Sequence, residues 1–227
     1  RYAGTRLGRQ ELNAEILEDV PGALWTRDMF DKTRVRGMWD GQAIITADGQ
    51  RIEMQRIVIG VDPSGSKGDD PEKADDIGII AAGKGVDGRG YVLGDWTCNM
   101  SPAGWGKRSV EAYRHFQADR IVGEQNFGGE MVRFVIQTAS PTVPVTLVHA
   151  SRGKVVRAEP IAALYEQGRV SHLTDPEGNS LELLEDQACQ MTSNGYVGDG
   201  SPDRVDAKVW ALSELMLDGS YDWSASL

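Results

Sequence analysis

The feature that most constrains the fold is a short apolar run that ends in a single acid. The run and the turn after it read Arg56-Ile57-Val58-Ile59-Gly60-Val61-Asp62-Pro63-Ser64-Gly65. A nearly continuous apolar run followed at once by turn residues predicts a buried central strand with a charge at its tip. Because a buried carboxylate is costly to desolvate, Asp62 should meet a cation or a hydrogen-bonding loop. An Asx turn, in which Asp62 only caps the loop, is the alternative.

Length and composition limit the class of protein. The 227 residues are 40% hydrophobic, and no apolar run approaches the ~20 residues of a membrane span, so we expect one α/β domain with an extension and no membrane contact. A formal net charge of −10 excludes a general basic coat and leaves nucleic-acid binding to local patches. Cys98 and Cys189 lack the spacing of a zinc site or a disulfide framework. The histidines show no ligand spacing and are expected to be packing or surface residues: His115, His149 and His172.

The order of the expected elements indicates the fold class. Three strands joined by glycine-rich turns, and then alternating helices and strands, are expected at 56–62, 77–82, 91–96, 102–117 (helix), 121–124, a helix that opens at Gly128-Gly129 and includes 131–136, 143–148, 157–166 (helix), 169–173, 181–191 (helix) and 203–217 (helix). An antiparallel meander followed by parallel strands, with helices on both faces of a mixed sheet, is the α/β ribonuclease H-like fold. Residues 1–50 are expected to be a connector, 51–217 the domain, and 218–227 a flexible tail.

Acidic residues occur at three comparable points of this order. Asp62 and Glu124 end two strands, and Asp203 and Asp206 begin the last helix. Because the carboxyl ends of parallel strands form one edge of a sheet, these acids are expected to converge. Converging carboxylates repel one another, and a hard divalent cation such as Mg²⁺ or Mn²⁺ resolves that repulsion with oxygen ligands alone. For Asp203 an N-cap role remains open.

One stretch after a strand is locally basic, at residues 151–157. It contains Arg152, Lys154 and Arg157 beside small residues. Small residues let a backbone come close to phosphate, so the three cations are candidates for contacts to the DNA backbone that do not read sequence. A solvated loop and helix start fits any one of these cations equally well.

Four segments together resemble the nuclease domain of the large terminase subunit of tailed bacteriophages. They lie at residues 59–65, 123–129, 152–160 and 201–207, and the resemblance covers about residues 55 to 217. Each motif alone is weak, and the specificity comes from their order and spacing. The segment around Pro21-Gly22-Ala23-Leu24-Trp25 is similar to the one that follows the packaging ATPase in such proteins. No Gly-x-x-x-x-Gly-Lys-Ser/Thr motif occurs in the sequence, so the resemblance implies an ATPase upstream of these residues.

The resemblance implies a metal-dependent endonuclease that cuts concatemeric double-stranded viral DNA during genome packaging, in the cytoplasm of the infected bacterial host. The family's first acid corresponds to Asp62, its second to Glu124, and its third to Asp206, with Asp203 as a co-ligand. Two Mg²⁺ or Mn²⁺ ions would activate a water and stabilise the leaving 3′ oxygen. Besides DNA, the implied partners are an N-terminal packaging ATPase, the portal and the small terminase subunit.

Two other functions use the same features. Phosphotransferases of the actin and sugar-kinase type also end their first strand in Asp beside a glycine turn, but they need a duplicated domain that 227 residues with one meander do not supply. A non-catalytic DNA-binding or docking module would not need acids at all three points.

Overall fold

The computed structural model describes residues 20–63, 76–125, 130–149, 153–174 and 181–217. Its elements in chain order are α2 (Arg27–Thr33), β1 (Val35–Trp39), β2 (Ala43–Thr46), β3 (Arg51–Pro63), β4 (Ile77–Gly85), β5 (Gly90–Asp95), α3 (Pro102–His115), β6 (Arg120–Glu124), α4 (Met131–Ala139), β7 (Val145–Val148), α5 (Lys154–Glu166), β8 (Val170–Thr174), α6 (Glu182–Ala188), β9 (Met191–Thr192), β10 (Gly195–Tyr196) and α7 (Asp203–Met216). No helix among these residues is both long enough and apolar enough to cross a membrane.

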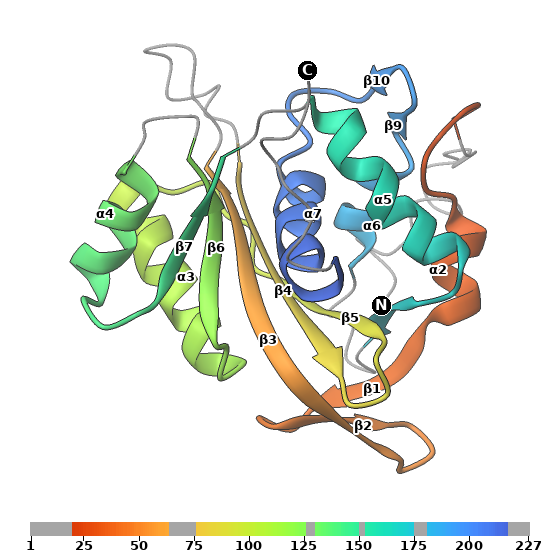
Figure 1. Ribbon diagram of the computed structural model, residues 1–227, viewed down its shortest axis with the longest axis horizontal. Helices are drawn as coiled ribbons and strands as arrows, with labels where there is room; N and C mark the ends of the chain where they lie inside the picture. The colour runs from red at the N-terminus through yellow and green to blue at the C-terminus, as the bar shows by residue number, and fades with distance from the viewer. Residues whose placement is uncertain (1–19, 64–75, 126–129, 150–152, 175–180, 218–227) are drawn as a thin grey trace, which may run out of the picture.

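Eight strands form one mixed sheet with the order β2-β1-β8-β5-β4-β3-β6-β7 and an additional β2–β3 pairing. β3, β4 and β5 are the predicted antiparallel meander, and β6 and β7 continue the sheet as parallel strands beside β3. β8 pairs in parallel with β5 at the other side. Figure 1 shows helices on both faces of this sheet. The ribonuclease H-like fold predicted from the sequence is confirmed.

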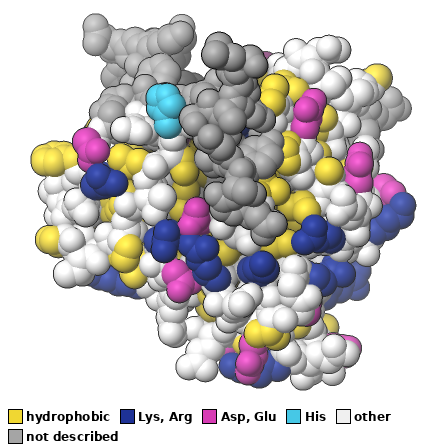
Figure 2. Space-filling view, in the orientation of Figure 1, with side chains coloured by type: hydrophobic (Ala, Val, Ile, Leu, Met, Phe, Trp, Pro, Cys, Tyr) yellow, Lys and Arg dark blue, Asp and Glu magenta, His cyan; other side chains and the backbone are white. Residues whose placement is uncertain are grey.

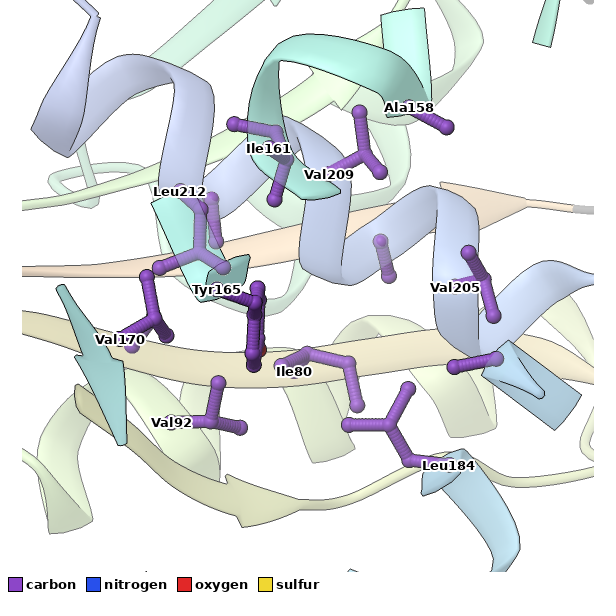
Figure 3. Packing of buried hydrophobic residues seen from close by; sticks show 14 of the residues in the cluster. Ile80, Val92, Ala158, Ile161, Tyr165, Val170, Leu184, Val205, Val209 and Leu212 are labelled. Carbon is purple, nitrogen blue, oxygen red and sulfur yellow. The ribbon is translucent and has the colours of Figure 1, made fainter. Parts of the chain in front are cut away.

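Two hydrophobic clusters, one on each face, hold the helices to the sheet. Because side chains alternate along a strand, Val58 of β3 packs on one face and Ile59 on the other. Val58 belongs to the cluster that contains α7, α5, α6 and Trp25, whereas Ile59 belongs to the cluster that contains α3 and α4. Figure 3 shows how Ile80 and Val92 of the meander lie near α7 and α5. Each such fully buried side chain contributes about 1.5–3 kcal/mol.

Helix α7 lies unusually close to β3 and β4. A Cβ atom added at Gly60 would be 2.0 Å from the carbonyl oxygen of Ala207, and one added at Gly78 would be 2.0 Å from that of Asp203. Glycine inside a strand often marks such an approach of another backbone. These two glycines therefore let the first half of α7 lie directly on β3, which ends at the edge of the sheet carrying Asp62, and on β4, which begins there.

The described part of the expected connector, residues 20–50, packs into the sheet and the core. β1 pairs in parallel with β8, and β2 pairs with both β1 and β3. Trp25 and Phe30 are fully buried in the cluster of α7. Their partners are more than 100 residues away in the chain, which is why the local pattern of this segment did not reveal its burial. The remaining expected connector residues and the expected tail at 218–227 lie outside the described residues.

Several expected elements begin or end elsewhere. β3 begins at Arg51 rather than 56, and α5 begins at Lys154 rather than 157. The expected flexible stretch before α7 contains a small antiparallel hairpin made of β9 and β10. The helix expected at 102–117 ends at His115, with Ser101 as its N-cap and proline in its first turn.

Candidate active site

Two of the predicted acids meet at one edge of the sheet. β3 and β6 are parallel neighbours, and their last paired residues are Val61 and Gly123. Asp62 and Glu124 follow directly, so the two carboxylates emerge side by side. Asp62 is buried, with 6% of its surface exposed, and Glu124 is half-buried. The convergence expected from the strand pattern is present for this pair.

The other two acids are in the first turn of α7. Asp203 is the first helical residue and not the N-cap, which is Pro202 without any side-chain capping bond. Asp206 is one turn in and, like Asp203, is 2% exposed. The N-cap role that the sequence left open for Asp203 is therefore not the one found in this structure.

A side chain from another helix supplies the missing cap. Gln187 of α6 accepts a hydrogen bond from the Val205 N–H at 3.0 Å and donates one to the Ser201 carbonyl oxygen at 3.2 Å. An unsatisfied N–H at a helix start is costly when buried, and this contact removes the cost for one of them. Arg204 adds two ion pairs, to Asp95 at 3.0 Å and to Asp76 at 2.8 Å. The start of α7 is thus fixed from both sides.

The four carboxylates are close enough to act on one another's charge. Burial, followed by the negative charges of Asp206, Asp203 and Glu124, raises the pKa of Asp62 well above its ordinary value, while Lys154 acts in the opposite direction. Burial and like charges both disfavour the ionised form of a carboxyl group. The surroundings of Asp62 therefore favour its protonated form. We call this edge of the sheet, with Asp62, Glu124, Asp203 and Asp206, the acid end.

Two cations of α5 occupy the space between the acids. Lys154 Nζ donates to a carboxylate oxygen of Asp206 and lies 3.3 Å from Ser201 Oγ. Burial by itself lowers the pKa of Lys154, but the charge and hydrogen bond of Asp206, together with the charges of Asp62 and Asp203, raise it overall. Lys154 remains 43% exposed at its side chain, so it also faces solvent.

Arg157 is the second cation, and it is buried. Its guanidinium nitrogens lie 3.8 Å from Glu124 Oε1 and 3.6 Å from Asp206 Oδ1, and its side chain is only 4% exposed. The guanidinium also stacks over the ring of Trp210, with Cζ 4.4 Å from the ring centroid. Arg157 thus ties β6 to α7 across the acid end.

The predicted DNA-binding cations differ in their surroundings. Arg152 lies outside the described residues. Lys154 is exposed beside the acids, whereas Arg157 is almost fully covered and contacts Glu124 and Asp206. Sequence reasoning did not find this bridging role, because nothing in residues 151–157 indicates which cation the fold buries. It also missed Gln187, whose partners belong to the loop before α7 and its first turn.

The three histidines are the packing or surface residues that the sequence predicted. His172 is buried between Tyr165 and Glu185, His115 lies against Trp96 and Phe116, and His149 is exposed.

The acid end has the chemistry of a divalent-cation site. All its anionic donors are carboxylate oxygens, the ligands that Mg²⁺ and Mn²⁺ prefer. Four carboxylates and two cations, Lys154 and Arg157, meet there. In their present arrangement, the described residues contain no group of three or more His, Cys, Asp or Glu side chains set to hold an ion. The residues fit a divalent cation by charge and donor type, and Lys154 and Arg157 now supply part of the positive charge.

Comparisons with known proteins point to one family. The family model described as the terminase RNaseH-like domain matches residues 59–215. No curated protein matches the sequence. Three solved structures are similar in fold. The large terminase nuclease from thermophilic phage G20c with bound magnesium is 15% identical, with a TM-score of 0.53 over 86% of this chain and 98% of that chain. The human cytomegalovirus terminase nuclease domain, Mn soaked and inhibitor bound, is 15% identical, with a TM-score of 0.56 over 86% and 96%. The HK97 bacteriophage large terminase is 11% identical, with a TM-score of 0.59 over 85% and 43%.

Proposed function

The chain belongs to the terminase RNaseH-like domain family, and on this premise we propose that it is a divalent-metal-dependent endodeoxyribonuclease that cuts concatemeric double-stranded viral DNA during genome packaging. The observation that supports this proposal is the convergence of Asp62, Glu124, Asp203 and Asp206 from two strands and one helix. Burial, followed by the charges of Asp206, Asp203 and Glu124, raises the pKa of Asp62, a perturbation typical of functional sites.

Mg²⁺ or Mn²⁺, as two ions, is the proposed cofactor. One similar nuclease structure has bound magnesium, and another was soaked with Mn. When bound, two such ions would lower the pKa of an attacking water and stabilise charge on the leaving 3′ oxygen. Asp62, Glu124 and Asp206 would hold them, with Asp203 as a co-ligand.

The remaining residues bind and orient. Lys154, half-exposed beside the acids, is placed to meet a phosphate of the DNA backbone. Arg157 keeps its proposed part in DNA binding only indirectly, because its burial leaves it to orient Glu124 and Asp206. Arg152 is proposed as a further phosphate contact. None of these cations reads a base, so the expected cleavage has no sequence preference.

The wider setting of this activity is also a proposal. The substrate would be double-stranded DNA in the cytoplasm of the infected bacterial host. The nuclease would work with an N-terminal packaging ATPase, the portal and the small terminase subunit. One similar structure, the HK97 large terminase, is a longer chain of which 43% is covered.

A plasmid-cleavage assay tests the proposal. Supercoiled plasmid is incubated with the chain and Mn²⁺, Mg²⁺ or EDTA, each with and without ATP. We expect nicked and linear products with either metal, none in EDTA, and no effect of ATP. Asp62→Asn should be inactive, and Asp48→Asn, which changes an exposed turn residue, should cut normally. Cleavage that survives EDTA, or that requires ATP, would contradict a metal nuclease, and DNA binding without any cleavage would favour a docking module.

A further inference from the structure

Cations gather at the end of the sheet opposite to the acids. Arg56 lies on β3, Lys84 is its register partner on β4, and Arg120 begins β6 beside Val58. We call these three residues the basic row. Their neighbours of the same strand parity, Val58, Ala82 and Val122, pack in the cluster of α7, so the basic row belongs to the α7 face. Figure 2 shows Lys and Arg side chains in a band across the lower half of the molecule.

Among the described residues, a single carboxylate forms the ion pairs of the basic row. Arg56 and Arg120 share one oxygen of Glu214, at 2.5 Å and 3.3 Å. Lys84 forms no ion pair with a described residue. The end of α7, at Met216, adds roughly half a negative charge. Arg56 and Lys84 are also directly opposite in the sheet, where like charges are destabilising. An anion at this surface would relieve that repulsion.

The basic row lies on the same strands as the acids. Arg56 and Asp62 are six residues apart on β3, and Arg120 and Glu124 are four residues apart on β6, each pair with the same strand parity. At about 3.3 Å per residue, these separations are about 20 Å and 13 Å. Duplex DNA rises about 3.4 Å per base pair, so they correspond to about 4–6 base pairs.

A duplex has room beside α7 rather than on it. α7 packs mainly over β3 and β4. β7, next to β6, is half-exposed along its whole length, and its Thr146 accepts a hydrogen bond from Arg120 at 3.3 Å. The strip formed by β6 and β7 therefore runs from the basic row to the acids.

We propose that the basic row is a second DNA-binding surface, which holds phosphates about 4–6 base pairs from the phosphate cut at the acid end. This inference rests on the proposed nuclease function, because the acid end fixes where the DNA is cut. Contacts by Lys and Arg to phosphates set the position of a duplex and do not read its sequence. Such a surface would let a chain of net charge −10 bind DNA through one local patch.

A double substitution with a matched control tests this surface. Lys84→Ala/Arg120→Ala removes two charges from the basic row. Arg36→Ala/Lys107→Ala removes the same residue types at exposed positions on β1 and α3, where neither residue forms an ion pair with a described residue. Binding to a 30-base-pair duplex is measured against salt, with all proteins carrying Asp62→Asn to prevent cleavage. We expect the slope of log K against log salt to fall by about 2 in the first variant and to stay unchanged in the control.

Two further measurements keep the test decisive. The charge-keeping variant Lys84→Arg/Arg120→Lys should restore the slope, which separates lost charge from a damaged fold. Polyglutamate, an anionic polymer without phosphates, should compete with the duplex for the wild-type protein less well than unlabelled duplex does. Equal slopes on the duplex, no measurable DNA binding, or equal competition by polyglutamate would each overturn the proposal.

The outcome is separable from that of the nuclease proposal. Plasmid cleavage with unchanged slopes would reject the basic row alone. A reduced slope without metal-dependent cleavage would reject the nuclease and leave a DNA-binding surface.

Discussion

Two groups of buried charge in this molecule differ in how they are balanced. At the acid end, Asp62 lies among three further carboxylates, and burial with their charges raises its pKa well above the ordinary value. In the second group, Glu185 of α6 is 2% exposed and accepts from Arg34 at 2.8 Å and from His172 at 2.8 Å. Burial by itself raises the pKa of Glu185, but these partners lower it to about 2.

The difference shows which carboxylates serve the fold. Glu185 receives its positive charge and hydrogen bonds from inside the chain, and burial lowers the pKa of His172, which keeps this ring neutral between Glu185 and Tyr165. Asp62 instead sits in a group whose charge the chain balances only in part. Removing a buried carboxylate that the protein has paired destabilises the fold, whereas a carboxylate that lies among other carboxylates is available for a ligand.

The largest expected effect is on cleavage, at the acid end. Asp62→Asn and Asp206→Asn should each abolish DNA cleavage. Asp62→Asn should also leave the melting temperature equal or higher, because it removes a repelling charge, whereas Asp206→Asn also breaks ion pairs to Lys154 and Arg157 and should lower it. The rise in melting temperature that Mn²⁺ produces should also disappear, since that rise requires binding to the folded state. If Asp206→Asn keeps both the rise and full cleavage, the third acid is Asp203, which the same measurements on Asp203→Asn would show.

The opposite result is expected for Glu185. Glu185→Gln leaves the half-buried Arg34 guanidinium with only the exposed Asp31 as an anionic partner, and breaking a buried ion pair costs about 3–5 kcal/mol. We expect this loss in the free energy of unfolding measured with denaturant, while the Mn²⁺-induced rise in melting temperature persists. Glu166→Gln, at an exposed position of α5, should change stability by less than about 0.5 kcal/mol. If Glu185→Gln were as stable as the wild type, the two groups of buried charge would not differ in their contribution to stability.

Acid should remove the contribution of Glu185 specifically. Its pKa is about 2 in the folded chain against an ordinary 4.5, so its stabilisation is fully present above pH 4.5 and is lost as the pH falls towards 2. A shift of this size corresponds to about 3 kcal/mol. The stability difference between wild type and Glu185→Gln should therefore shrink by about that amount between pH 6 and pH 2, as measured by urea unfolding at each pH. A difference that does not depend on pH would mean that Glu185 acts through packing alone.

A smaller effect is expected where α7 touches the sheet. Gly60→Ala places a Cβ against the carbonyl oxygen of Ala207, and such overpacking costs about 1–3 kcal/mol. Because α7 must shift, Asp206 moves relative to Asp62, and the Mn²⁺-induced rise should weaken. Gly90→Ala is the matched control, since it lies under the other end of α7 with its nearest atoms 3.4 Å away. If the two variants behave equally, the close approach of α7 to the sheet does not determine the positions of the carboxylates at the acid end.

The smallest effect is expected at Lys154. Lys154→Ala should lower the slope of log K against log salt for DNA binding by about 1, the loss of one phosphate contact. Lys154→Arg should keep the slope. If Lys154→Ala leaves the slope unchanged, this lysine serves only to balance Asp206.

The sequence predicted those parts of the fold and site that have a local signature. Strand periodicity with glycine turns indicated the meander, and Asp62 and Glu124 were recognisable because each ends an apolar run. The burial of Glu185 had no such signature, because its partners come from residues 151 and 13 positions away in the chain. Gly60 carried a signal that could have been used, since glycine inside a strand suggests a close backbone.

The structure of residues 20–50 was not predicted from the sequence for a related reason. β1 and β2 have five and four residues, too few for a clear alternation, and Trp25 is buried by elements that come later in the chain. Arg157 was recognised as a cation, but its burial was not predicted. That burial depends on its place on α5 and its contact with Trp210, and not on the residues next to it in the sequence.

The pairing of β2 with both β1 and β3 has a consequence for self-association. In the eight-stranded sheet of the described residues, every strand except β7 has a neighbour on each side. Open strand edges are templates for pairing with another copy of a chain, and short edges beside proline resist it. β7 has four residues and follows Pro144, whose ring leaves no N–H to offer. At high concentration, the eight-stranded sheet of the described residues therefore presents only one short edge from which a β-sheet aggregate could grow.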